Sequence, residues 1–168
     1  SGSIKTTWAL SAVGKKWFAE LDPGGYKRAD PFESLVESGE VTLKKYDRPS
    51  LLDDEGYMDT SLVGRSGSGP ARIAHHYNGW HALLRSIYGD FMAALRKEDA
   101  ADTFIFDTAT VLWDIAQNAT RERVQGLGLS AQETTDRLKR LEYEEPNLYM
   151  SAFIQESRAR NKDLIFIA

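Results

Sequence analysis

The spacing of apolar residues in the first part of the chain predicts two helices and a strand. Between residues 10 and 21 apolar positions recur at steps of three and four, which indicates a helix that the turn residues 22–25 end. Residues 30–39 carry an N-cap acceptor, a proline at the first helical position and a closing glycine, so a short helix is expected there. Residues 41–46 are β-prone and begin to alternate, which predicts one strand.

The second part of the chain shows longer helical patterns. Residues 70–97 hold apolar positions at steps of three and four throughout and predict the longest helix. A second helix is expected over residues 101–124. A capping box at Ser130 predicts that a new helix begins there and ends before Pro146. A final helix is expected over residues 147–161.

These elements together predict a mainly α fold. We expect about five helices packed as an irregular bundle, with a minor β element at residues 41–46 that can pair with residues 164–167. A single globular domain is expected over residues 4–168. It is expected to start at residue 4 because residues 1–3 have the composition of an expression scar. Residues 47–69 have no periodicity and are expected to form a long mobile loop.

Composition narrows the class of protein. The chain has 168 residues, is 42% hydrophobic, contains no cysteine and carries a net charge of −4. These values predict a soluble globular protein without disulfides or thiolate metal sites, and they favour a cytoplasmic location. The absence of a basic excess argues against a nucleic-acid partner, and no apolar run is long enough to cross a membrane.

The loop at residues 47–69 offers two candidate binding features. Its acidic part is most simply a hydrated loop, but Tyr57 and Met58 between the acids favour a segment that docks on a partner. Its Gly/Ser-rich part precedes an expected helix, where Arg65 and Arg72 flank a candidate anion site. That stretch lacks the Lys and Ser/Thr that end a phosphate-binding loop.

The histidines at positions 75, 76 and 81 suggest a metal site at first sight. On one continuous helix their side chains would diverge, because ligands on a helix need a spacing of three or four residues to share a face. We therefore expect no metal site here and assign no cofactor.

Residues 128–138 resemble the opening helix of bacterial helix-turn-helix modules, in which G-L-S, an acidic residue and a leucine recur. The resemblance implies a recognition helix over residues 147–160. The chain departs from the pattern at Thr134 and Thr135. Three glutamates at positions 142, 144 and 145 would also repel the phosphates of DNA.

Several apolar side chains lie outside the core faces of the expected helices, and this favours a protein partner. On the expected helix over residues 101–124, Phe106 and Trp113 lie beside the core face and either pack in the core or meet a partner. Leu164, Ile165, Phe166 and Ile167 form an apolar tail that could pair within the chain or with a neighbour.

The sequence therefore favours a non-enzymatic interaction or assembly module that associates with itself or another protein. No catalytic residue is assigned. One alternative is an enzyme or ligand-binding domain with a cleft under the loop at residues 47–69; a helix-turn-helix regulator is another. The cleft would gather Asp53, Asp54 or Asp59 with Arg72, His76 and Tyr77.

Overall fold

A parallel β-sheet forms the centre of the molecule. The computed structural model describes residues 2–22, 32–49, 63–65, 73–75, 79–127 and 131–168. In the sheet the strand order is β2-β1-β5-β6, and every neighbouring pair is parallel. The strands are β1 (Lys16–Glu20), β2 (Val41–Lys45), β5 (Thr103–Asp107) and β6 (Asp163–Ile167).

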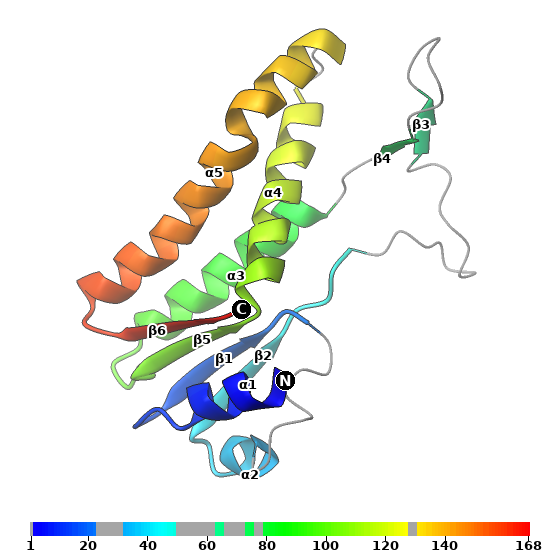
Figure 1. The fold of residues 1–168 in the computed structure, drawn as a ribbon. Coiled ribbons are helices and arrows are strands. Elements are labelled where there is room, and N and C mark those ends of the chain that lie inside the picture. Colours follow the sequence, from blue (N-terminus) through cyan, green and yellow to red (C-terminus); the bar gives the residue numbers. More distant parts are fainter. Residues whose placement is uncertain (1, 23–31, 50–62, 66–72, 76–78, 128–130) are drawn as a thin grey trace.

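Helices cover both faces of this sheet (Figure 1). One face carries α1 (Gly2–Leu10) and α2 (Phe32–Glu37), and the other carries α3 (Trp80–Leu95), α4 (Ala109–Gln125) and α5 (Ala131–Ala159). Two short strands, β3 (Val63–Arg65) and β4 (Ile73–His75), form a separate antiparallel pair. No helix in the described part of the chain has the length and apolar character needed to span a membrane.

The two faces of the sheet have separate cores. Under the three long helices, rings from the sheet and the helices meet edge to face, with centroids 5.0–6.2 Å apart around Phe91. Under α1 and α2 a smaller core forms around Phe18, whose ring meets Phe32 at 5.3 Å. Both central strands are therefore buried along their whole length, as is typical of parallel sheets covered by helices.

The expected mainly α bundle is wrong, because the chain has an α/β fold with a parallel sheet. The reason is visible in β1 and β5, which lie inside segments that we expected to be helical. A strand buried on both faces reads as a continuous apolar run, so its residues also satisfy a helical spacing. Between α1 and β1 the chain turns at Gly14, whose φ of +84° favours glycine.

The boundaries of the other expected helices also differ. The segment 70–97 contains β4 and α3, which begins at Trp80, and the segment 101–124 contains β5 before α4. At the start of α3, Glu122 of α4 accepts hydrogen bonds from the backbone N–H groups of Gly79 and His81. A side chain distant in sequence thus satisfies the free amides of this helix.

The expected helix break at Pro146 does not occur, because α5 continues through this residue to Ala159. A proline inside a helix costs about 3 kcal/mol, since it removes a backbone donor. Contacts with α4 on either side of Pro146 offset this cost. Arg123 makes a two-point ion pair with Glu145, and Trp113 Nε1 donates to Asn147 Oδ1 at 3.3 Å. A turn between two helices, which a helix-turn-helix module needs, is therefore absent at residues 146–147.

The strand expected at residues 41–46 is present as β2, but its expected pairing with residues 164–167 is wrong. β2 pairs with β1 at one edge of the sheet, and β6 pairs with β5 at the other edge. The apolar tail is thus part of the sheet of its own chain.

The aromatic core between the sheet and α5 gives a direct test of this packing. Phe153 is fully buried, and we expect Phe153→Ala to lower the free energy of unfolding by about 3–5 kcal/mol. Leu148 lies on the same helix with 69% of its surface exposed, so Leu148→Ala should change the free energy by less than about 0.5 kcal/mol. Urea unfolding of both variants makes the comparison, and equal losses would contradict the described packing.

Candidate functional site

The carboxyl ends of the four parallel strands meet at one edge of the sheet. Open α/β sheets bind ligands outside this edge, because the loops that follow the strands meet there. α1 runs antiparallel to the strands, so its first turn lies at the same edge (Figure 1). The edge therefore brings together the first turns of α1 and the ends of β1, β5 and β6.

A buried hydrogen bond joins α1 to the end of β5. Thr6 Oγ1 donates to Asp107 Oδ2 at 3.1 Å, and both residues are less than a tenth exposed. Thr6 is held there because Ala9 and Leu10, one helical turn further on, pack in the smaller core against the sheet. A hydroxyl and a carboxylate are thus fixed side by side at the edge.

A second carboxylate lies beside this pair. Glu20 ends β1, is 4% exposed and is the register partner of Asp107 on the neighbouring strand. Register partners on adjacent parallel strands are about 4.8 Å apart and project their side chains to the same face of the sheet. Glu20 and Asp107 therefore both face the side of the sheet that α1 covers.

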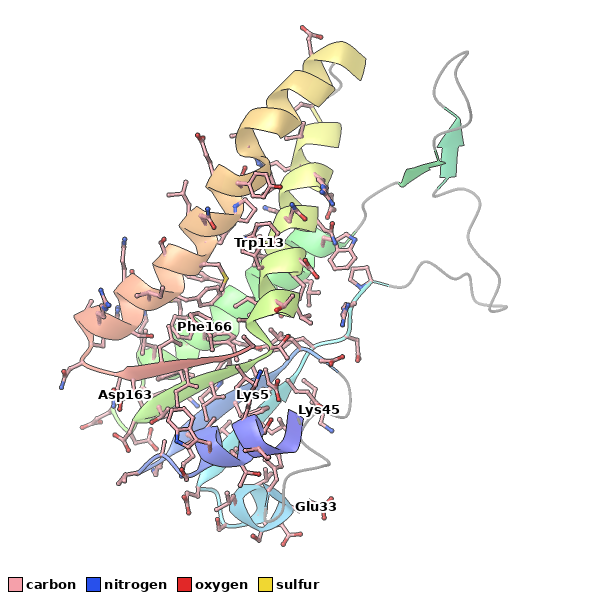
Figure 2. All side chains as sticks on the ribbon, viewed as in Figure 1. Lys5, Glu33, Lys45, Trp113, Asp163 and Phe166 are labelled. Carbon is pink, nitrogen blue, oxygen red and sulfur yellow. The ribbon has the colours of Figure 1, made fainter. Side chains whose placement is uncertain are left out.

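Lys5 adds a positive charge at the same edge of the sheet, at the end of β6, which neighbours β5. Its side chain is exposed, and its Nζ donates to the main-chain carbonyl of Ala168 beyond the end of β6 (Figure 2). The N-terminal end of α1 adds the positive end of a helix dipole at the same place. The edge thus combines an ammonium group with buried oxygen ligands.

The buried position of Asp107 disfavours the charged form of its carboxyl group. Burial raises the pKa of Asp107, and the negative charge of Asp22 raises it further, while the hydrogen bond from Thr6 lowers it. A bound cation would favour the charged form and reverse the shift. Oxygen ligands of this kind suit Mg²⁺, which protein sites bind through one or two carboxylates together with substrate phosphates.

The described residues contain no group of three or more His, Cys, Asp or Glu side chains with the geometry of a metal site. The edge therefore does not form a cage made of protein ligands alone. A cation held by Thr6 and Asp107 would need further ligands from a substrate.

A second polar cluster ties β2 to α3 and has a structural role. Tyr46 Oη donates to Asp90 Oδ2 at 3.0 Å, and Lys44 Nζ lies 3.6 Å from the same oxygen. Burial, followed by the neighbouring charge and hydrogen bond of Asp90, raises the pKa of Tyr46 far above its ordinary value. Tyr46 therefore stays protonated as a hydrogen-bond donor.

Phe106 and Trp113, which were expected either to pack in the core or to meet a partner, lie on different elements. Phe106 is on β5 and is fully buried against Phe91, Phe153 and Phe166. Trp113 is on α4, half-buried, with its ring 6.0 Å from that of Tyr143 on α5. The helix on which they were expected to lie side by side does not exist.

The remaining candidate residues lie largely outside the described parts of the chain. Arg65 is in β3, His75 in β4 and His81 in α3, so the divergence argued for one continuous helix does not apply. The other candidates of the loop and the histidine cluster fall outside the described residues: Asp53, Asp54, Tyr57, Met58, Asp59, Arg72, His76 and Tyr77.

Sequence reasoning missed Lys5, Thr6, Glu20 and Asp107. The signal was present in two apolar β-prone runs that each end in an acid, K-W-F-A-E and T-F-I-F-D. Because both runs lie in segments that were expected to be helical, the sequence did not predict that their acids lie together at one edge of a sheet. A lysine followed by a threonine also occurs at positions 5 and 6, outside the Gly/Ser-rich stretch before residue 70.

Comparison with models of protein families, with curated proteins and with solved structures gives no significant match to this chain.

Proposed function

We propose that this chain binds a nucleoside triphosphate with Mg²⁺ at the carboxyl edge of its sheet and hydrolyses the terminal phosphate. The observation that carries this proposal is the buried hydrogen bond from Thr6 Oγ1 to Asp107 Oδ2, with Lys5 directly before Thr6. In phosphate-binding loops that end in G-K-[ST], the lysine contacts the β- and γ-phosphates. The hydroxyl of the Ser/Thr and an aspartate then hold the metal ion.

The chain departs from that motif at one position of the printed sequence, since Ile4 stands where the motif has glycine. Ile4 is 74% exposed, so its side chain is turned to solvent rather than towards Asp107. The likeness to phosphate-binding loops is limited to the combination of a lysine, a hydroxyl and an aspartate. The proposed function rests on these residues and not on membership of a family.

Each of the residues has a distinct task in this proposal. Lys5 leaves the carbonyl of Ala168 and contacts the phosphates, which its exposed side chain can do at little cost. Thr6 and Asp107 provide oxygen ligands for Mg²⁺, which supplies positive charge to the phosphate oxygens. A bound cation would offset the cost of burying the charged Asp107 carboxylate, which accepts a hydrogen bond from Thr6.

In this proposal Glu20, the second carboxylate at the edge, is the general base that activates water. Its carboxylate takes a proton from the water whose oxygen forms a bond to the terminal phosphorus. The bond from that phosphorus to the bridging oxygen breaks, and the nucleoside diphosphate leaves with the electron pair.

The first prediction from the proposed function concerns nucleotide binding. We expect ATP with Mg²⁺ to raise the melting temperature of the protein, since a ligand at a hundred times its Kd adds about 2.7 kcal/mol of stability. Lys5→Ala should raise the Kd about 10- to 100-fold, because a hydrogen bond between charged groups is worth about 1.5–3 kcal/mol. Lys15→Ala is the matched control, because Lys15 is an exposed lysine at the opposite edge of the same sheet. A wild-type protein without an Mg²⁺-dependent shift contradicts the proposal.

The second prediction concerns Asp107 and pH. Because its pKa is raised in the folded state, the free energy of unfolding falls as pH rises from the ordinary carboxyl value of 3.8 through the raised pKa, and is constant above it. Asparagine does not ionise, so Asp107→Asn removes this decrease in the free energy of unfolding. We therefore expect the ligand-free variant to be more stable than wild type at neutral pH, with the difference closing in acid, and to gain nothing from Mg²⁺. Urea unfolding over a pH series measures both effects, and a less stable variant at neutral pH would contradict this reading.

The third prediction separates hydrolysis from binding. Glu20→Gln should keep the melting shift with Mg²⁺ and ATP but lower the rate of phosphate release about 10²- to 10⁴-fold, the usual contribution of a general base. Glu37→Gln, on the exposed side of α2, should leave both unchanged. Equal phosphate release by wild type and Glu20→Gln would remove Glu20 from the reaction while leaving the binding proposal intact.

A further inference from the structure

The two edge strands of the sheet differ in how they are protected. Edge strands expose unpaired backbone groups, and proteins block them with charged residues, above all lysine. β2 carries exposed lysines at positions 44 and 45. β6 has Leu164, Ile165 and Phe166 in its centre, all half-buried, and its only charge is Asp163 at its start.

Among the described residues, no strand pairs with the outer side of β6. Asp163 N donates to the carbonyl of Asp102, so Asp163, Ile165 and Ile167 direct their backbone groups towards β5. Backbone direction alternates along a strand, so Leu164 and Phe166 direct their N–H and C=O groups to the open edge. These groups fit another strand as a partner.

We propose that the open edge of β6 pairs with β6 of a second copy of this chain, antiparallel and around a twofold axis at Ile165. In this register Leu164 of each copy lies opposite Phe166 of the other. Both residues have outward backbone groups, so each such pair exchanges both of its N–H···O=C bonds. The two Ile165 side chains then meet as a non-hydrogen-bonded pair, the arrangement in which side chains approach most closely.

Charge complementarity at the two ends of this interface supports the second copy as the partner. Asp163 is exposed and shares the face of Ile165 and Ile167, which is the side that α1 covers. In the antiparallel register it lies opposite Ile167 of the other copy, next to the Ala168 carbonyl that Lys5 Nζ contacts. Each end therefore places a carboxylate near an ammonium group, as a twofold interface repeats every contact.

The proposed pairing assigns the self-association expected from the apolar tail to the outer edge of β6. The tail stays in its own sheet and offers its free edge, rather than leaving its domain as an arm. The strand pairing uses the backbone of β6 and the side chain of Ile165. Lys5, which the proposed nucleotide site also uses, only adds charge at the two ends of the interface.

Oligomeric state measured by sedimentation velocity over a micromolar concentration series tests the pairing. The wild type should show a concentration-dependent dimer. Ile165→Lys and Ile165→Glu should each raise the dimer dissociation constant about tenfold or more, because like charges would face each other across the axis and a buried isoleucine is lost. Leu43→Lys, at the corresponding half-buried position of β2, is the matched control and should leave the dimer unchanged.

Mixing the two charge variants keeps the test decisive even if each variant loses some stability. Lysine and glutamate at position 165 attract each other across the axis, so the mixture should form a heterodimer more tightly than either variant forms its own dimer. Circular dichroism confirms that each variant is folded before mixing. A monomeric wild type, a mixture that stays monomeric, or dissociation caused by Leu43→Lys would each overturn the proposal.

Discussion

The pairing of β1 with β5 organises both cores and the carboxyl edge of the sheet. These two strands occupy the middle of the sheet, and helices bury them on both faces. Their register places Phe18 beside Ile105 in one core and Trp17 beside Phe104 in the other. A shift of one residue would turn the side chains of one strand to the opposite face, so both cores fix the same register.

The same register determines the chemistry at the carboxyl edge. Glu20 and Asp107 continue the two apolar strands by one residue each and are therefore carried into a buried position. Burying a carboxylate is unfavourable unless it is paired or hydrogen-bonded, and the raised pKa of Asp107 reflects this. The fold thus holds acidic groups in a place that favours a cation, which is the physical basis of the proposed nucleotide site.

Polar contacts between distant segments complete the packing of the helical layer. Glu122 caps the start of α3 from α4, and Arg123 on the same helix binds Glu145 of α5. These bonds act at points where the local sequence gives a weak signal: a helix that starts without its own capping side chain, and a helix that continues through a proline. Tertiary contacts therefore set the helix boundaries in this layer.

The amino-acid sequence alone was sufficient to predict the elements whose signal is local. It correctly predicted the strand at residues 41–46, a short helix near Phe32 and helical structure between Trp80 and Leu95, because capping residues and surface periodicity act within a few positions. It did not show the sheet or the site. β1 and β5 satisfy both a helical and a buried-strand pattern, and only the helices on both faces decide between them. Thr6 and Asp107 are 101 positions apart, so only the closed sheet brings the hydroxyl and the carboxylate together.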